Sequence, residues 1–372
     1  MVELRHGNGA LELVDRRTGG SFVPRGANLL MKVREGDHVA SGLFRPRDWN
    51  PDAVDRELGR MEALGYNTVR VFIDLCNVDC IATKRASIRP EYARNIARFL
   101  RIAKSHGLVV LLASNDLPDR GYGIQLPCCD PFGGYRNSLW LTAKGHALLR
   151  GYWVDVILAL KRADAPLGAV FAYEIQQEQF LLRGVAPLSF DSGMVTTADG
   201  RSYDMSVDAQ KEAMIASNTR LAVRKVRSAI RATDPGALVT MGFFPGFPDD
   251  FRVVPSAALL DHSALDLYDL HLYPAVGYDM QTGVDTLGLT DGVTKPVVMG
   301  EFGAFRFAYP DAEAGSAALV QWQEESCAFG FDGWMVWLWA RTDDEVFGAR
   351  EDHDAIARAL SPEQRPDPCA AP

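Results

Sequence analysis

Two glutamates, Glu178 and Glu301, stand at the ends of predicted strands and are the residues best placed to do chemistry. Glu301 follows the apolar run 297–299, where a lone buried carboxylate would be costly. Its position indicates either a structural ion pair, with Arg70 as the candidate partner, or a function. Glu178 ends a polar run that contains Glu174, so a solvated loop carboxylate is the competing interpretation. We interpret Glu178 and Glu301 as functional, and Glu174 as a supporting partner.

Two carboxyl groups that share one site are the smallest set of groups able to cleave a glycosidic bond. One donates a proton to the leaving oxygen, and the other attacks the anomeric carbon or activates water. The acid must stay protonated near neutral pH, and burial or a neighbouring negative charge raises the pKa of a carboxyl group in that direction. Arg70 is expected to hold the attacking carboxylate ionised and oriented.

Other polar and aromatic side chains recur in phase near the ends of predicted strands. Residues two apart on a strand share a face, so Asp269, His271 and Tyr273 lie on one side. We expect His271 and Tyr273 to hydrogen-bond sugar hydroxyls or Glu301, with a satisfied buried histidine as the alternative. Trp339 is expected to offer an apolar face to a sugar ring, with an ordinary core tryptophan as the alternative.

The elements that must position these residues alternate along the chain. The expected strands are 22–30, 68–74, 108–114, 169–175, 238–244, 267–272, 296–302 and 333–339. The helical patterns cover 51–64, 90–106, 142–162, 207–233, 255–262, 283–292, 311–329 and 351–360. Such alternation predicts parallel strands with helices outside them. Eight units predict the α/β class and a closed (β/α)8 TIM barrel, whose active site lies at the C-terminal ends of the strands.

Two long loops follow strands three and four, on the face where a barrel builds its site. Residues 115–140 are rich in Gly, Pro and Asp, and residues 179–205 contain Ala198-Asp199-Gly200, a good hairpin turn. Loops of this length are usually functional. Asn115, with its neighbour Asp116, either binds sugar hydroxyls or forms an Asx turn, and the sequence leaves both possibilities open. We expect one catalytic domain over residues 1–360, followed by a loosely held Pro-rich C-terminal tail, 361–372.

Composition excludes several classes of protein. The 372 residues include 48 Asp and Glu against 39 Lys and Arg, a formal net charge of −9, which argues against nucleic acid as a partner. Hydrophobic residues make up 47% and charged residues 23%, the balance of an ordinary globular protein. No apolar run reaches the roughly 18–20 residues of a membrane helix, so no membrane span is expected.

Six cysteines in a chain of this length do not predict a disulfide scaffold. A pairing of Cys76 with Cys80 stays open, and free or partly buried thiols are the preferred interpretation. No second Cys/His pair has the spacing of a zinc site, so we expect no metal. The first 20 residues lack the apolar stretch of a secretory signal, which leaves a cytoplasmic protein and a mature secreted form as alternatives.

Over residues 20–345 the chain resembles the clan A retaining glycoside hydrolases, near the cellulase and β-mannanase families (family 5-like). The nucleophile motif Lys-Pro-x-x-x-x-Glu-Phe-Gly is matched by residues 295–303. Residues 173–178 fit the frame of the acid/base run Trp-Glu-x-x-Asn-Glu-Pro, with Gln179 in place of the proline. Further matches are the Arg of strand two, the His-x-Tyr of strand six, the Trp of strand eight and the opening of strand one. In this chain they are Arg70, His271-Leu272-Tyr273, Trp339 and Gly26-Ala27-Asn28. The Asn115-Asp116 pair with Phe132-Gly133-Gly134 is similar to the third loop of β-mannanases.

The resemblance implies a retaining glycoside hydrolase that cleaves a β-linked oligosaccharide or polysaccharide, of β-mannan or β-glucan type, by double displacement. Glu301 would be the nucleophile and Glu178 the acid/base, while Arg70, His271 and Tyr273 position the nucleophile. No cofactor is implied. The sugar would be held by Trp339 and by Gln177.

Gln177 departs from the family pattern, since it replaces the usual asparagine that contacts the 2-hydroxyl group of the sugar. This departure motivates the alternative of a catalytically impaired carbohydrate-binding barrel. A metal-dependent hydrolase or a phosphate-binding isomerase would need a His-x-His pair on strand one or a Gly-rich phosphate loop, and the sequence contains neither. The sugar, the linkage, exo or endo action and the oligomeric state stay open.

Overall fold

The computed structural model describes residues 1–7, 9–35, 38–75, 80–115, 117, 119–123, 135–246, 251–254, 264–289, 293–339 and 345–369. The helix expected over 255–262, the motif at 132–134 and Asp116 lie outside these residues. None of the helices within the described ranges is both long enough and apolar enough to cross a membrane.

A ring of parallel strands forms the centre of the molecule. The strands are β3 (Arg25–Leu29), β6 (Thr68–Phe72), β7 (Val109–Ala113), β8 (Val170–Glu174), β12 (Val239–Thr240), β13 (Gly242–Phe243), β15 (Tyr268–His271), β16 (Val297–Phe302) and β17 (Phe331–Trp339). Their order is β12-β8-β7-β6-β3-β17-β16-β15-β13. Only Met241 separates β12, which pairs with β8, from β13, which pairs with β15. This segment therefore closes the ring, and the expected (β/α)8 barrel is confirmed.

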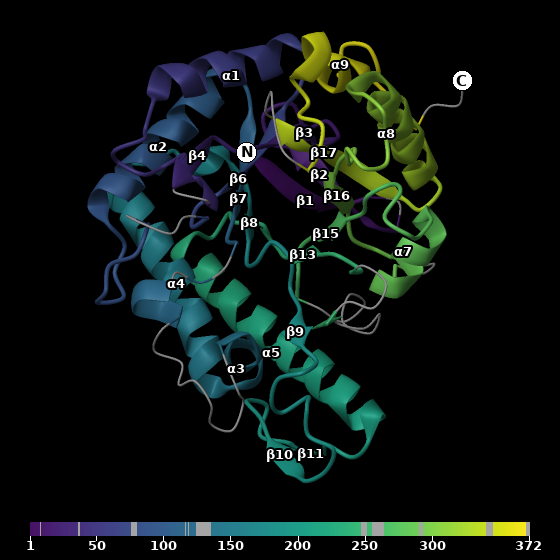
Figure 1. The fold of residues 1–372 in the computed structure, drawn as a ribbon. Helices are drawn as coiled ribbons and strands as arrows, with labels where there is room; N and C mark the ends of the chain where they lie inside the picture. The colour runs from purple at the N-terminus through teal and green to yellow at the C-terminus, as the bar shows by residue number, and fades with distance from the viewer. Residues whose placement is uncertain are drawn as a thin grey trace.

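Helices surround the strands (Figure 1). They are α1 (Pro51–Ala63), α2 (Pro90–Ser105), α3 (Tyr135–Leu141), α4 (Ala143–Arg162), α5 (Asp208–Thr233), α7 (Met280–Leu287), α8 (Ala312–Cys327) and α9 (Glu351–Ala359). Local chemistry sets where they begin. The Asn50 side chain accepts a hydrogen bond from the Ala53 N–H and Pro51 follows it, while Asp311 caps α8 in the same way.

The core has two layers. The larger layer lies between the strands and the helices, and the smaller layer fills the barrel with residues such as Leu111, Phe171 and Val298. Val2 and Leu13 join the inner layer from an antiparallel hairpin of β1 (Val2–His6) and β2 (Leu11–Asp15). The sequence analysis expected no element before residue 22, so this hairpin is an addition to the predicted barrel.

The two long loops after strands three and four carry their own structure. The turn at 198–200 joins β10 (Met194–Thr196) to β11 (Ser202–Asp204), as the sequence predicts. This hairpin, α3 and the start of α5 extend to one side of the barrel (Figure 1). Asn137 of α3 donates to the Leu182 and Val185 carbonyl oxygens and accepts from the Leu182 N–H, which connects the two loops. Leu182 belongs to β9 (Leu181–Leu182), which pairs with β14 (Arg252–Val253). After strand one, β4 (Lys32–Glu35) pairs with β5 (His38–Ser41).

The C-terminal tail differs from the expectation. Cys369 forms a disulfide with Cys327 at the end of α8, and Cys80 is also disulfide-bonded. Arg25 donates to the carbonyl oxygens of Leu360 and Arg365. The predictions of free thiols and of a loosely held tail are therefore wrong for these residues. The sequence showed no signal because the two cysteines lie 42 residues apart and meet only when the tail packs against the barrel.

Candidate active site

Glu178 and Glu301 come together at the C-terminal ends of the barrel strands. Glu301 lies within β16, and Glu178 lies four residues after the end of β8. One oxygen of each carboxylate and one ring nitrogen of His271 all lie within 4.8 Å of one another. Their exposure differs, because the Glu301 side chain is 4% exposed and the Glu178 side chain is 18% exposed. The fold thus brings together two carboxyl groups that are 123 positions apart in the sequence, one of them facing solvent more than the other.

Arg70 of β6 is the cation at the centre of the site, and its side chain is completely buried. Its Nε and Nη2 atoms donate to the two oxygens of Glu174 at 2.6 and 2.7 Å. Its Nη1 atom donates to Oδ1 of Asn28 at 2.6 Å and to Oε1 of Glu301. Burial alone would lower the pKa of Arg70, but Glu174 and Glu301 raise it well above its ordinary value. The guanidinium therefore stays charged and holds one oxygen of Glu301.

Tyr273 holds the other oxygen of Glu301. Its hydroxyl donates to Oε2 of Glu301 at 2.7 Å. Burial and the charges of Glu301 and Glu178 raise the pKa of Tyr273 well above its ordinary value. The hydroxyl therefore keeps its proton and stays a donor. Arg70 and Tyr273 together fix the plane of the Glu301 carboxylate, as the sequence analysis expected of residues that position it.

Glu178 has a different environment from Glu301. Oε1 of Glu178 lies 3.1 Å from Nδ1 of His271, and Nη1 of Arg252 donates to Oε2 at 3.2 Å. Burial raises the pKa of Glu178, while the charge of Arg252 acts in the opposite direction. The net shift is upward, so this carboxyl group holds a proton to higher pH than an exposed glutamate does.

A close backbone contact sets the position of Glu178. The Gly242 N–H donates to the carbonyl oxygen of Gln176, and the Gln179 N–H donates to the carbonyl oxygen of Gly242. A Cβ atom at Gly242 would lie 1.7 Å from the carbonyl oxygen of Gln177. Only glycine permits this approach, because any side chain would push the loop that bears Glu178 away from the barrel.

The expectation that Trp339 stacks on a sugar is wrong. Its indole lies on the outside of the strand ring, where Nε1 donates to Glu57 of α1 and the ring packs on Tyr66. Trp337 instead lies on the inner side with Tyr273 and Phe72. The pairing of β17 with β3 shifts between Val336 and Trp339, and this irregularity breaks the strict alternation that put Trp337 and Trp339 on one face.

Backbone hydrogen bonds hold the two remaining predicted residues, Asn115 and Gln177. Asn115 is half-buried just after β7, and its backbone N–H donates to Oδ1 of Asp74 at 2.6 Å. Gln177 is half-buried and directly precedes Glu178, and its backbone N–H donates to the carbonyl oxygen of Ser114. Substrate contacts of Asn115 and Gln177 stay predictions.

Three contributors to the site had little or no signal in the sequence. Asn28 bonds Arg70 and the Gly300 carbonyl oxygen, yet the sequence offered only a likeness to a strand-one opening. The strand periodicity places Asp269 in phase with His271 but indicates no role for it. Arg252 lies in a two-residue strand that no periodicity reveals, and only the pairing of β14 with β9 brings it to Glu178.

Two groups of side chains within the described residues place possible cation ligands close together. They are Glu174 with Asp269 and His271, and Glu178 with His271 and Glu301. Each group contains a carboxylate that Arg70 already binds. The guanidinium thus supplies positive charge where an ion would otherwise do so, and the expectation of no metal stays a prediction.

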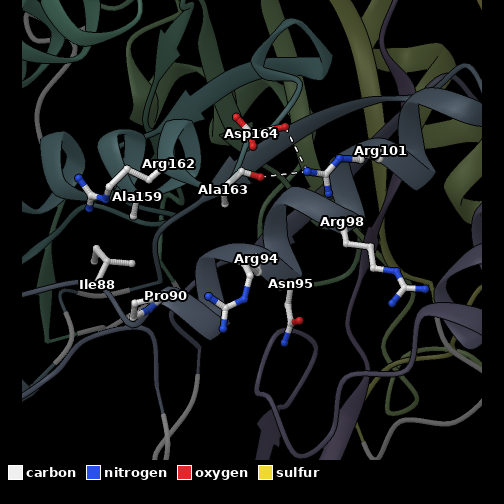
Figure 2. A pocket seen from close by; sticks show the side chains of 10 residues that line it. All are labelled: Ile88, Pro90, Arg94, Asn95, Arg98, Arg101, Ala159, Arg162, Ala163 and Asp164. Atoms are coloured by element: carbon white, nitrogen blue, oxygen red, sulfur yellow. Dashed lines mark hydrogen bonds between the residues drawn. The ribbon is translucent and has the colours of Figure 1, made fainter.

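A separate cavity lies outside the barrel, between α2 and α4. It measures about 530 Å³, and Figure 2 shows the side chains of Arg94, Arg98, Arg101 and Arg162 around it. Arg101 donates to the carbonyl oxygens of Ala163 and Asp164 at 2.9 and 3.2 Å (Figure 2). All four arginines are exposed to solvent.

Comparison with known proteins supports the fold assignment. An endo-1,4-β-mannanase from Rhizomucor miehei superposes with a TM-score of 0.64 at 16% identity, over 98% of this chain and 99% of that one. An exo-β-1,4-mannosidase from an Opitutaceae bacterium gives 0.61 at 15% identity, over 97% and 62%. An endocellulase from Pyrococcus horikoshii gives 0.59 at 14% identity, over 98% and 99%. No protein-family model and no curated protein sequence matches the chain. The protein therefore has the TIM-barrel fold of mannanases and cellulases.

Proposed function

We propose that this protein is a retaining glycoside hydrolase that cleaves a β-linked saccharide. The observation that carries the proposal is the pair of carboxyl groups, Glu178 and Glu301, with oxygens within 4.8 Å of each other. Retaining enzymes hold their two carboxyl groups roughly 5–5.5 Å apart, whereas inverting enzymes need roughly 6.5–9.5 Å to admit a water molecule. The separation of Glu178 and Glu301 is therefore closer to that of retaining enzymes than to that of inverting enzymes.

In the first step Glu301 acts as the nucleophile. Its oxygen forms a bond to the anomeric carbon while the bond from that carbon to the leaving oxygen breaks. Glu178 transfers its proton to the leaving oxygen, so the leaving group departs as a neutral alcohol. Arg70 and Tyr273 hold both oxygens of Glu301, which keeps the attacking carboxylate aimed in one direction.

In the second step Glu178, now ionised, accepts a proton from water. The water oxygen forms a bond to the anomeric carbon, and the bond to Glu301 breaks, which restores both carboxyl groups. Two inversions leave the configuration of the anomeric carbon unchanged. The raised pKa of Glu178 suits a group that must begin the cycle protonated, and its contact with Arg252 suits the ionised state that follows.

We propose a β-1,4-linked mannan or glucan type of substrate. The fold neighbours include an endo-1,4-β-mannanase and an endocellulase, and the barrel covers nearly the whole of both chains. Trp337, beside Tyr273 on the inner side of β17, would supply the apolar face for a sugar ring that the sequence analysis assigned to Trp339. Gln177 and Asn115 would contact hydroxyl groups of the substrate.

The test uses a panel of aryl β-glycosides together with β-mannan and β-glucan polymers. We expect release of sugar from at least one of these substrates. Proton NMR during the first minutes of turnover should show the β-anomer before mutarotation. An α-anomer as the first product would contradict the double displacement, and binding of glycans without turnover of any substrate would contradict the hydrolase assignment.

A further inference from the structure

Asp269 is a buried acid next to the site that the proposed mechanism does not use. It lies in β15 two residues before His271, and it is completely buried. Neither of its carboxylate oxygens has a hydrogen-bond partner of ordinary geometry among the described residues. Its polar neighbours are the backbone N–H of Gly300 and Nε2 of His271, which lies 3.6 Å from Oδ1 of Asp269 and also has no partner in the described part of the chain.

The space for this carboxyl group is made by a glycine. A Cβ atom at Gly300 would lie 1.8 Å from Oδ1 of Asp269, so no residue with a side chain fits there. Gly300 directly precedes Glu301 in β16. The side chain of Asp269 thus presses against the backbone that carries Glu301, and its position depends on the residue type at 300.

The charges around Asp269 do not balance unless a proton is added. Glu174 from β8 and Glu301 from β16 both bind Arg70 of β6, which is the one buried cation that these two carboxylates contact in the described structure. Asp269 would add a third buried negative charge near the same guanidinium. A buried charge without a partner is strongly unfavourable, so this region favours one further proton.

Glu174, His271 and Asp269 are the groups that can hold this proton. Burial raises the pKa of Glu174 well above its ordinary value, but both of its oxygens accept hydrogen bonds from Arg70, which leaves His271 and Asp269 as the better candidates. Burial and the charge of Glu301 raise the pKa of Asp269, while the charges of His271 and Arg70 and the backbone N–H of Gly300 act against that rise. Burial also lowers the pKa of His271. Both shifts place the proton on the carboxyl side of the contact between Oδ1 and Nε2, where the carboxyl group can donate it to the ring.

We propose that Asp269 is a positioning residue that keeps a proton between its carboxyl group and Nε2 of His271, so that the Nδ1–H of the ring points to Glu178 and Glu301. Nε2 then serves as the acceptor, and the hydrogen of the neutral ring must reside on Nδ1. Nδ1 lies 3.1 Å from Oε1 of Glu178 and 3.6 Å from Oε2 of Glu301. The catalytic consequence of this arrangement rests on the proposed function.

The orientation of the ring matters because Nδ1 faces both carboxyl groups. As a donor it stabilises Glu178 after that residue has given up its proton. As a bare nitrogen it would direct a lone pair at two oxygens, which would disfavour the ionised form of Glu178 that must activate water. Loss of the Asp269 proton at high pH would move the ring hydrogen to Nε2 and remove the donor.

The direct test is the protonation state of the ring, which does not depend on turnover. The wild-type protein is labelled with 15N-histidine, and the His271 signals are assigned by their loss in His271→Gln. We expect the chemical shift of a protonated nitrogen at Nδ1, and that of an acceptor or shared-proton nitrogen at Nε2. A protonated Nε2 with a bare Nδ1 in the wild-type protein at pH 6–7 would overturn the proposal, whether or not the protein hydrolyses glycosides.

Kinetics of three variants supply the second readout. Asp269→Asn keeps an N–H that can donate to Nε2, so we expect its kcat/KM to stay within about fivefold of wild type. Asp269→Ala lacks a donor and should lose about 10- to 100-fold, with an altered pH profile and a ring signal that shifts toward protonated Nε2. Asp266→Asn is the matched control. Asp266 is also a buried acid and lies just before the same strand, but its carboxylate forms ion pairs with Arg227 and Arg231.

The control should lose stability and keep the wild-type pH profile. If Asp269→Asn and Asp269→Ala lose activity equally, with pH profiles and ring signals that match wild type, then Asp269 only fills space and the proposal is wrong. If no variant and no wild-type sample turns over any glycoside, the proposed function fails, while the NMR result still decides the role of Asp269.

Discussion

The molecule places arginines in two contrasting settings. At the ends of the barrel strands, Arg70 is fully buried and binds two carboxylates and Asn28. In the cavity between α2 and α4, four arginines line the wall and are exposed to solvent (Figure 2). Both regions carry charge, but only the first combines charge with burial and fixed geometry.

The difference follows from the dielectric environment. Water and salt screen exposed charges within about 8–10 Å, so an exposed arginine gains little from its neighbours. The two charges of a buried ion pair attract each other strongly. Each partner is held in place, because moving it away would leave the other charge buried and unpaired. Burial therefore converts the charges around Glu301 into a rigid arrangement, which the outer cavity lacks.

The largest expected effect comes from removing Glu301, the proposed nucleophile. Glu301→Ala should lower kcat by about 10⁴-fold or more, because no other group can form the covalent intermediate. Circular dichroism should show an intact fold. Glu313→Ala, which removes an exposed glutamate of α8, is the matched control and should keep wild-type turnover. Near wild-type activity of Glu301→Ala on the true substrate would refute the assignment.

The second effect separates the proposed acid, Glu178, from the proposed nucleophile. Glu178→Ala should lose about 10²- to 10⁴-fold on substrates with poor leaving groups, and far less in the first step on aryl glycosides with activated leaving groups. In the wild type the raised pKa of Glu178 predicts that kcat/KM for poor leaving groups falls as pH rises through that pKa. The variant should lack this decline. Equal losses on both kinds of substrate would contradict the acid role.

The third prediction applies one substitution to both regions. Arg70→Lys keeps the charge but cannot reach Asn28, Glu174 and Glu301 together, so the free energy of unfolding should fall by about 2 kcal/mol or more. Arg98→Lys at the exposed cavity should change it by about 0.5 kcal/mol or less. Urea denaturation of the two variants measures this difference. Comparable losses would mean that burial does not distinguish the two regions.

The smallest effect is expected from the outer cavity itself. Replacing Arg94, Arg98 and Arg162 by glutamine should leave kcat/KM on the best glycoside within about twofold of wild type, because exposed charges on the outside of the barrel have little influence on the buried carboxylates. Assays at low and high salt check this expectation. A tenfold loss at low salt would show that the outer arginines act on the reaction.

The strands and the paired glutamates could be predicted because their signals are local. Each of the eight predicted strands overlaps an observed one, since short apolar runs between helical patterns carry that information in neighbouring residues. Arg70, Tyr273 and Glu301 follow from placement at strand ends, where a barrel gathers side chains from all its strands. The N-terminal hairpin was not predicted, because its apolar residues Val2 and Leu13 are buried only by packing against the barrel interior, which lies far away in the sequence.

The amino-acid sequence alone determined the alternation of elements, the closed ring that this alternation implies, and the two glutamates at strand ends. The tertiary structure decided that Trp337 rather than Trp339 faces inward, that Arg252 reaches Glu178, and that Cys369 pairs with Cys327. The physical reason is the distance along the chain over which each interaction acts. Periodicity records which face a residue takes within a regular strand, whereas a register shift, a two-residue strand and a tail contact depend on segments distant in the chain.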